Sequence, residues 1–235
     1  MSKLASESSS GESLLPEHKE MQRILVVTSV AAERDAVLRG LNDHARFSVV
    51  IGGVGAAAAA ASTAAALAVG EYDLVICAGI AGGFADVAEV GSLVVASEVV
   101  AADLGAENGE NDFISIDELG FGSARAAVDA SLAARLAAAL EAAQFVVSVG
   151  PVLTLSTVTG TASSAAVLAK RVPGAAAEAM EGYGVAIAAQ QRGIPFLELR
   201  SISNVIGPRD RSAWRIPQAL QALEAASTVC SEVLR

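Results

Sequence analysis

The sequence is poor in the residue types that most often carry metal and redox chemistry. Its 235 residues include only two cysteines and two histidines. Cys77 and Cys230 show no metal-ligand spacing and form no disulfide framework, which fits a cytoplasmic protein in a reducing environment. His18 falls in a polar N-terminal stretch and His44 in a polar turn. We therefore expect no metal site and a chemistry that runs largely without histidine.

Positive charge is also scarce. The chain has 16 Lys and Arg residues against 26 Asp and Glu residues, a formal net charge of −10 at pH 7. Binding a nucleic acid requires basic surface stripes that neutralise phosphates. This charge balance therefore argues against a nucleic-acid partner and leaves small-molecule substrates open.

Long, strongly apolar runs are absent too, although 53% of the residues are hydrophobic. Two long stretches lack charge, residues 47–70 and 142–169, but glycines interrupt the first, and Pro151 with many Ser and Thr residues interrupts the second. A helix that spans a membrane needs about 20 strongly apolar residues. We therefore expect no membrane association.

The chain divides into a short tail and one domain. Residues 1–20 are rich in Ser and Glu and have no apolar core segment, which predicts a disordered tail rather than a secretory signal. Residues 21–235 alternate between short apolar runs and alanine-rich segments, which predicts a single α/β domain. We expect strands at 23–28, 47–51, 72–78, 91–101, 146–156 and 196–202, and helices at 56–69, 124–143, 162–170, 185–191 and 215–234.

Polar groups are expected at the carboxyl ends of these strands, where ligands bind in open α/β sheets. Glu33 lies in a helix that residues 28 and 29 can cap, just after the first strand. A glycine-rich turn at 79–84 follows the third strand, and Ser203 and Asn204 follow the last one. Glu181 precedes the helix at 185–191. Each acid also has a purely structural explanation, because helix N-termini favour negative charge, and Asn204 is a common turn residue.

One glycine pattern, Gly53-x-Gly55-x-x-Ala58, partly matches the dinucleotide-binding fingerprint. It follows the second expected strand rather than the first, and the acid about 20 residues on, Asp73, precedes a strand where a ribose-binding acid should follow one. We therefore expect no NAD site. The polar residues 107–122 are expected to form a long loop over the pocket.

In this order along the chain, Glu33, the turn at 79–83, Met180-Glu181 and the motif at 200–204 resemble the purine nucleoside phosphorylase/nucleosidase superfamily. The resemblance covers residues 21–235. Residues 103–107 and 200–214 look most like the branch that hydrolyses a hypoxanthine nucleoside with a benzoate-like 5′ extension. The resemblance implies an α/β domain around a mixed, partly barrel-like central sheet flanked by helices, usually in a homo-oligomer. It also implies cleavage of an N-glycosidic bond by water through an oxocarbenium-like ribosyl, with no cofactor.

The same resemblance implies roles for individual residues. Glu33 would position and deprotonate the attacking water. Glu181 would accept hydrogen bonds from the ribose hydroxyls, and Asn204 would contact the base; we take these three as catalytic. Further substrate contacts are implied for the backbone near residues 157–158 and for Ile80, Ala81, Gly82, Val158, Met180, Ser203 and Arg200, the last as a group that orients a carboxylate.

Asn204 departs from the adenine-specific members of the superfamily, which carry Asp at this position. A carboxylate suits the amino group of adenine, whereas an amide can donate to O6 of a 6-oxopurine and accept from a proton on N7. Asn204 therefore indicates hypoxanthine or guanine as the leaving base. Arg209, Arg211 and Arg215 are candidates for a cationic mouth that holds the 5′ extension, and equally for a solvated face.

Other functions stay open at this point. A phosphate-dependent 6-oxopurine nucleoside phosphorylase would place phosphate where the hydrolase places water, but the carboxylate of Glu33 would repel it. A nucleosidase for another purine nucleoside and a ligand-binding relative without catalysis are further alternatives. The presence of both Glu33 and Glu181 favours an enzyme.

Overall fold

The first strand, β1 (Ile24–Thr28), is buried along its whole length. It pairs in parallel with β2 (Phe47–Ile51) on one side and with β3 (Leu74–Gly83) on the other. The computed structural model describes residues 23–109 and 113–234. The predicted tail at residues 1–20 lies outside these described residues.

An eight-stranded mixed sheet forms the centre of the described chain, in the order β10-β4-β8-β9-β3-β1-β2 with β7 beside β4. β10 also pairs with β3, so the strands from β10 to β3 close on themselves while β1 and β2 extend outward. This arrangement confirms the predicted α/β fold with a mixed, partly barrel-like sheet. The strands completing it are β4 (Leu93–Ala101), β7 (Arg125–Ala127), β8 (Val147–Thr154), β9 (Ala177–Ala179) and β10 (Phe196–Val205).

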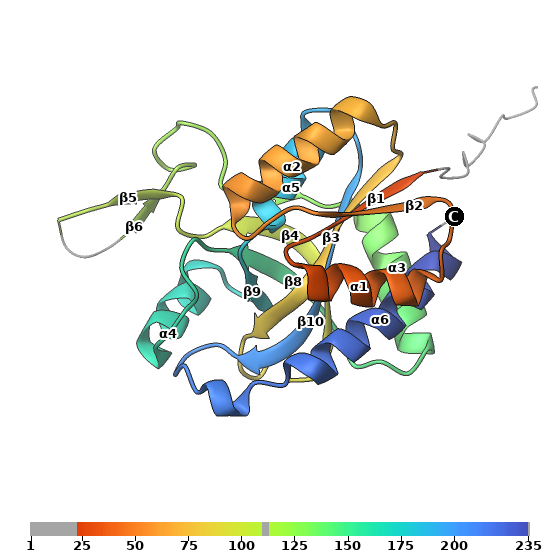
Figure 1. Cartoon of the computed structure of the whole chain (residues 1–235). Helices are drawn as coiled ribbons and strands as arrows, with labels where there is room; N and C mark the ends of the chain where they lie inside the picture. The colour runs from red at the N-terminus through yellow and green to blue at the C-terminus, as the bar shows by residue number, and fades with distance from the viewer. Residues whose placement is uncertain (1–22, 110–112, 235) are drawn as a thin grey trace, which may run out of the picture.

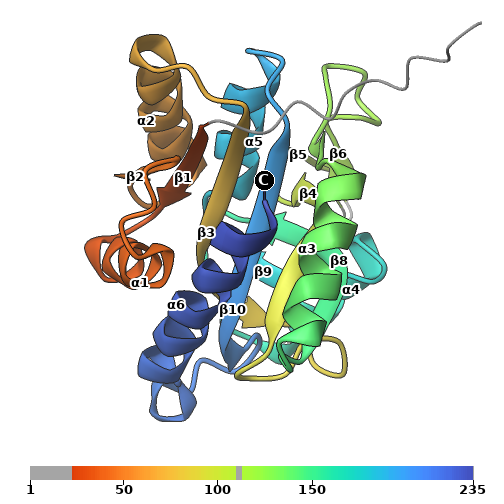
Figure 2. The same ribbon diagram turned by 90° about the vertical axis from the view of Figure 1, so that its right-hand side faces the viewer.

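Helices cover the sheet from several sides (Figures 1 and 2). Side chains alternate along β1, so that Ile24 and Val26 join one apolar core and Leu25 and Val27 join another. The first core is completed by α1 (Ala31–Leu41), α3 (Ala130–Ala142) and α6 (Ile216–Val233), and the second by α2 (Ala56–Val69) and α5 (Gly182–Gln190). A third, smaller core lies under α4 (Ala162–Arg171).

Two segments that were expected to follow strands lie inside strands in the structure. The glycine-rich residues 79–83 continue β3, which pairs with β10 on one side and, at Gly82 and Gly83, with β9 on the other. Small residues are needed there, because a Cβ on Gly83 would lie 2.1 Å from the carbonyl oxygen of Ala88. Ser203 and Asn204 likewise lie inside β10 rather than after it. Pairing with neighbouring strands therefore sets the extended conformation of both segments.

Two other segments also differ from the prediction. The helix expected from residue 124 begins at Ala130, because the side chain of Asp129 accepts the amide of Leu132 as its N-cap, and residues 125–127 pair with β4 instead. The described part of the segment at 107–122 does not cover the pocket. It contains one strand of a hairpin, β5 (Gly105–Glu107) with β6 (Phe113–Ser115), which projects from the body of the molecule (Figure 1).

None of the helices in the described chain is long and apolar enough to cross a membrane. Their apolar residues are directed toward the sheet, as the buried Leu132, Leu136 and Leu140 of α3 show. The hydrophobic residues noted in the sequence therefore build the cores between helices and sheet.

Candidate active site

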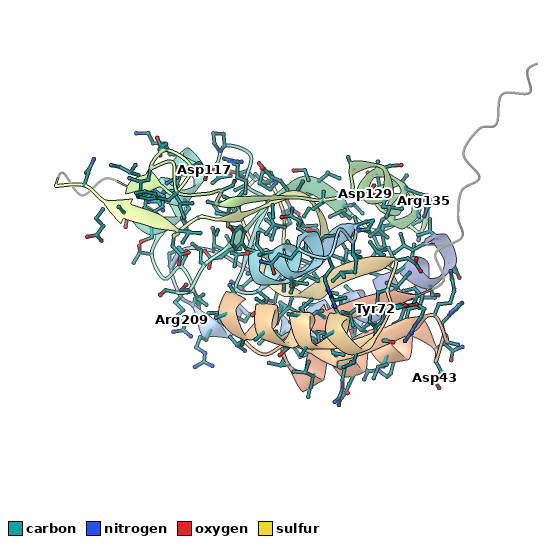
Figure 3. The ribbon with its side chains drawn as sticks, turned by 90° about the horizontal axis from the view of Figure 1, so that it is seen from above. Asp43, Tyr72, Asp117, Asp129, Arg135 and Arg209 are labelled. Atoms are coloured by element: carbon teal, nitrogen blue, oxygen red, sulfur yellow. The ribbon has the colours of Figure 1, made fainter. Side chains whose placement is uncertain are left out.

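A cavity of about 280 Å³ opens where β1, β3 and β10 end. It lies at one end of the molecule, as Arg209 at its mouth and Asp43 at the opposite end show in Figure 3. The structure brings nine of the ten predicted site residues to its wall: Glu33, Ile80, Ala81, Gly82, Val158, Met180, Glu181, Ser203 and Asn204. Arg200 is not part of this wall.

Glu33 is 2% exposed and is fixed by its hydrogen bonds. Its Oε2 accepts from the backbone amide and hydroxyl of Ser29 and from the amide of Val30, while among the described residues its Oε1 accepts only from the amide of Ile80, at 2.8 Å. The prediction that residues 28 and 29 cap α1 is wrong, because Val30 is the N-cap residue. The carboxylate of Glu33 accepts from the nearby amides instead. Oε1 keeps lone-pair capacity for another donor.

Glu181 is the N-cap residue of α5 and is 5% exposed. Its Oε1 accepts from the amide of Gly55 at 3.3 Å, and its Oε2 accepts from its neighbour's amide, that of Met180, at 3.3 Å. Gly55 has φ 92° and is the N-cap residue of α2, so this helix N-terminus directs an amide at the carboxylate. The glycine pattern at 53–58 thus contributes a backbone amide that holds the carboxylate of Glu181.

Arg200 lies behind the wall of the cavity and is 1% exposed. Its Nε donates to Glu198 Oε1 at 2.7 Å, whereas its Nη2 lies 3.4 Å from Glu181 Oε2. The guanidinium therefore holds two carboxylates of the protein and has no place in the wall for a substrate carboxylate. Its contact with Glu181 makes Arg200 a residue that positions this acid of the cavity wall.

Glu198 is fully buried beneath α5, and the sequence analysis did not single it out. Burial raises the pKa of its carboxyl, while the ion pair with Arg200 opposes that shift. Its Oε2 has no hydrogen-bond partner among the described residues. A Cβ on Gly182 would lie 2.1 Å from this oxygen, so the glycine leaves room for the carboxylate. The thiol of Cys77 accepts from Arg200 Nη2 at 3.1 Å, and burial raises its pKa well above the ordinary value.

Asn204 is held in one orientation by its neighbours. Ser203 donates its hydroxyl to Asn204 Oδ1 at 2.9 Å, and Asn204 Nδ2 donates to the carbonyl of Val205 at 3.1 Å. One N–H and a lone pair of the amide stay available toward the cavity. Asn204 therefore offers one donor and one acceptor side by side.

The structure adds residues to the cavity that the sequence analysis missed. Glu178 of β9 is 5% exposed and lines the cavity together with Thr159, whose amide donates to Glu178 Oε1 at 2.8 Å and whose hydroxyl donates to Oε2. Burial raises the pKa of Glu178, and the bonds from Thr159 oppose that shift. The segment around Glu178 is short and rich in alanine, which left no pattern from which to predict it.

The mouth of the cavity is apolar with cations beside it. Val54, Val205 and Trp214 line it, as does Arg209, whose guanidinium carbon lies 5.9 Å from the centre of the Trp214 ring. Arg211 lies 5.8 Å from the same ring but outside the wall of the cavity. Of the three arginines proposed for the mouth, only Arg209 reaches it.

The site can perform acid–base and electrostatic chemistry with its own side chains. In the described part of the chain, no group of three or more His, Cys, Asp or Glu residues is arranged to hold a metal ion. Glu33, Glu181 and Asn204 come from the start of α1, the start of α5 and the end of β10, and the fold gathers them at one cavity. Two carboxylates and an amide around a small cavity suit a polar ligand with several hydroxyl and ring-nitrogen groups.

Comparisons with known proteins identify relatives of the chain. A family profile described as the phosphorylase superfamily matches residues 15–235. The chain is 49% identical over 231 residues to a futalosine hydrolase of Streptomyces coelicolor, covering 90% of this chain and 96% of the relative. It is 47% identical over 215 residues to a futalosine hydrolase of Acidothermus cellulolyticus, covering 86% and 87%. The native structure of a futalosine hydrolase of Helicobacter pylori superposes with a TM-score of 0.78 at 18% identity, covering 90% of this chain and 97% of that one, which supports the fold.

Proposed function

The chain belongs to the phosphorylase superfamily and, within it, to the futalosine hydrolases, and from this membership we propose how its cavity cleaves futalosine. The reaction is hydrolysis of the N-glycosidic bond to dehypoxanthine futalosine and hypoxanthine, without a cofactor, in the futalosine route of menaquinone biosynthesis. The observation that carries the proposal is the meeting of Glu33, Glu181 and Asn204 at one cavity of about 280 Å³.

Glu33 acts as the base that activates the water. In the described part of the chain its Oε1 has a single partner, the amide of Ile80, and therefore has lone-pair capacity for a water molecule at the wall of the cavity. Departure of the purine leaves positive charge on the ribosyl, which a nearby carboxylate stabilises. A phosphate ion at this position would be repelled by the same carboxylate, which favours water as the nucleophile.

Glu181 binds the ribose hydroxyls. Its carboxylate is fixed by the amides of Gly55 and Met180 and by Arg200 behind it, so its position is set before the sugar arrives. Preorganised groups of this kind contribute to catalysis because they need no rearrangement as charge develops. Met180, which precedes Glu181 and also lies at the wall, packs against the sugar.

Asn204 binds the base. Its Nδ2 donates to O6 of hypoxanthine and its Oδ1 accepts from N7–H, while the hydroxyl of Ser203 keeps the amide from rotating. Protonation at N7 makes the base a neutral leaving group, so an acceptor at this position assists bond cleavage as well as binding.

The 5′ extension of futalosine lies at the mouth. Its benzoate-like ring packs against Trp214 and its carboxylate pairs with Arg209, because an arginine forms strong hydrogen bonds to a carboxylate. Within the described residues, no hydrogen bond or ion pair is seen for Arg209, whose contact is the cation–π interaction with Trp214. The guanidinium is therefore available to a ligand.

The remaining expectations concern location and assembly. Two buried, free thiols, Cys77 and Cys230, fit a cytoplasmic protein. For a homo-oligomer, the supporting feature is the hairpin of β5 and β6 with Phe121 beyond it, whose side chain is 79% exposed. We propose that a second copy of the chain covers this ring, because a large exposed aromatic side chain is typical of protein interfaces. Light scattering on wild type and Phe121→Ser tests this, and an unchanged molecular mass contradicts it.

One assay tests the hydrolase assignment. Futalosine, inosine and adenosine are incubated with the enzyme in buffers with and without phosphate, and free base and sugar product are measured. We expect hypoxanthine from futalosine at the same rate in both buffers and a free hydroxyl at C1 of the sugar product. A sugar 1-phosphate, with turnover lost in phosphate-free buffer, would establish a phosphorylase instead.

A further inference from the structure

Glu178 is a third carboxylate at the wall of the cavity, and the proposed mechanism gives it no role. It differs from the other two acids in its place, because it lies on β9 while Glu33 and Glu181 begin helices. Its side chain is almost fully buried in the protein and yet faces the cavity. A buried carboxylate beside a binding cavity is costly unless hydrogen-bond donors satisfy it.

The register of three strands places Glu178 opposite Asn204. In β3, Gly82 pairs with Glu178 of β9 on one side and with Asn204 of β10 on the other. Adjacent strands lie about 4.8 Å apart, so the two backbones flank Gly82 at a separation of roughly 10 Å. Glu178, Gly82 and Asn204 all line the same cavity. The glycine has no side chain, which leaves the space between the carboxylate and the amide open.

A side chain at Gly82 would narrow this space. A Cβ there would lie 3.3 Å from Asn204 Nδ2 and 2.5 Å from Ile206 Cγ2. The cavity is therefore shaped so that one ligand can reach the amide of Asn204 and the carboxylate of Glu178 together. A flat ring with polar atoms along one edge has the form that fits between them.

Glu178 retains capacity for one more donor. A carboxylate has about four lone-pair sites, and Thr159 fills two of them with its amide and its hydroxyl. These two bonds fix the orientation of the carboxylate without saturating it. The free sites belong to a side chain that lines the cavity, so a ligand N–H is the partner they lack.

The base that Asn204 recognises has such a group. A 6-oxopurine carries an acceptor at O6 and, next to it, a donor at N1–H, whereas a 6-aminopurine carries a lone pair at N1. We propose that Glu178 accepts the N1–H of the 6-oxopurine while Asn204 contacts O6 and N7, so that the two residues together select the base. This inference rests on the proposed function, because it assumes that the base is bound against Asn204.

The consequence is a double selection against 6-aminopurines. The N1 lone pair of adenine would face the carboxylate of Glu178, and its amino group would face the donor of Asn204. A hydrogen bond to a charged group contributes enough that its loss corresponds to about 10- to 100-fold in kcat/KM. Sites built on such bonds reject analogues that lack the partner group.

The experiment compares three nucleosides with the same 5′ extension: futalosine, its N1-methyl derivative and its 6-amino counterpart. Wild type, Glu178→Gln and the control Thr159→Val are assayed for kcat/KM, with thermal melting as a check of folding. The glutamine is isosteric and can donate its amide to N1 of the 6-amino base. The valine removes the Thr159 hydroxyl but leaves the backbone donor to Glu178 in place.

We expect wild type to hydrolyse the N1-methyl derivative at least about 10-fold less efficiently than futalosine. Glu178→Gln should shift the ratio of kcat/KM for the 6-oxo and 6-amino nucleosides by about 10- to 100-fold toward the 6-amino compound. Thr159→Val should change both rates by a similar factor and leave that ratio within about threefold of wild type, because it alters only the support of the carboxylate.

Two results would overturn the inference while leaving the hydrolase assignment intact. One is equal use of futalosine and its N1-methyl derivative by wild type, which needs no variant to fold. The other is a Glu178→Gln enzyme that loses activity on both nucleosides equally, as Thr159→Val is expected to do. A wild-type enzyme that releases no hypoxanthine from futalosine would overturn the proposed function and this inference together.

Discussion

Replacing Gly79 with alanine tests whether the position of Glu33 limits the rate. Gly79 lies within β3 and has no positive φ, so alanine is compatible with its backbone. The added Cβ would lie 2.6 Å from Glu33 Oε1 and 2.8 Å from Arg200 Nη1. Carbon atoms essentially never approach other heavy atoms that closely, so at least one of these groups must move.

The size of the effect follows from these distances. Glu33 Oε1 must retreat by roughly 0.5 to 1 Å to reach ordinary van der Waals contact. Glu33 Oε2 is held by three donors from Ser29 and Val30, so the carboxylate is expected to rotate about this oxygen. That rotation moves Oε1 away from the place proposed for the water. A misplacement of about 1 Å costs on the order of 100-fold in rate. We therefore expect kcat to fall by about 100-fold in Gly79→Ala.

The assay separates this effect from general damage. Release of hypoxanthine gives kcat and KM, and calorimetry gives the affinity for free hypoxanthine, which should bind as in wild type because we propose that it contacts Asn204 rather than Glu33. Gly160→Ala is the control, because a Cβ there meets nothing within 4 Å and Gly160 does not line the cavity. A folded Gly79→Ala enzyme with native kcat would refute the role of Glu33 as the base.

Four further changes have defined outcomes. Glu33→Gln should lower kcat by about 100- to 10,000-fold in steady-state assays while hypoxanthine still binds in calorimetry, because a general base contributes that much. Asn204→Asp should lower kcat/KM for futalosine by about 10-fold or more and lower it less, or raise it, for the 6-amino nucleoside, so an unchanged ratio contradicts base recognition by this amide. Arg209→Gln should raise KM for futalosine but not for inosine, which lacks the 5′ extension; equal changes would place the extension elsewhere. Finally, burial raises the pKa of Glu178 above its ordinary value of 4.5. Between these two pKa values the folded chain holds a proton on Glu178 that the unfolded chain has lost. The free energy of unfolding therefore falls as pH rises from 4.5 through the raised pKa. Glu178→Gln should remove this part of the pH dependence in denaturant titrations between pH 4 and 8.

The fold was largely predictable because its main strands are continuous apolar runs, which are typical of strands that are buried on both faces of a sheet. The exceptions are informative. Residues 79–83 have almost no side chains, which is typical of a turn, and their conformation is set by pairing with β9 and β10 from far along the chain. The strand at 125–127 was likewise hidden in an alanine-rich run typical of a helix. The local sequence does not distinguish strands from helices or turns where alanine and glycine dominate, since these residues have small side chains and show no alternation of polar and apolar positions.

The site was predictable where polar residues interrupt apolar segments. Glu33, Glu181 and Asn204 stand out for this reason, and the fold does gather them at the cavity. Glu178 did not stand out, because β9 has only three residues and its neighbours are alanines. Its place depends on pairing with β3 and on a hydrogen bond to Thr159, 19 residues earlier. Such contacts are set by the tertiary fold and have no local signal.

The role of Arg200 could have been predicted from the charged residues of β10. Along β10, Glu198 and Arg200 share the face of the strand that also carries Phe196, and opposite charges two residues apart in a buried strand indicate an internal ion pair. That pairing decides how Glu181 can act. Glu198 takes the close contact with the guanidinium, at 2.7 Å, and Glu181 takes the longer one, at 3.4 Å.

The unequal sharing of one guanidinium has a chemical consequence for the site. A carboxylate bound tightly and alone by an arginine has its charge largely neutralised, and a bidentate contact occupies two of its roughly four lone-pair sites. Because Glu198 takes the shorter bond, Glu181 is restrained by the cation and yet keeps acceptor capacity for the ribose hydroxyls that we propose it binds. Removing one partner of such a buried pair leaves an uncompensated charge, at a cost of about 3–5 kcal/mol. The ion pair of Glu198 and Arg200 thus links the stability of the sheet to the position of Glu181, whose negative charge we propose stabilises the developing ribosyl cation.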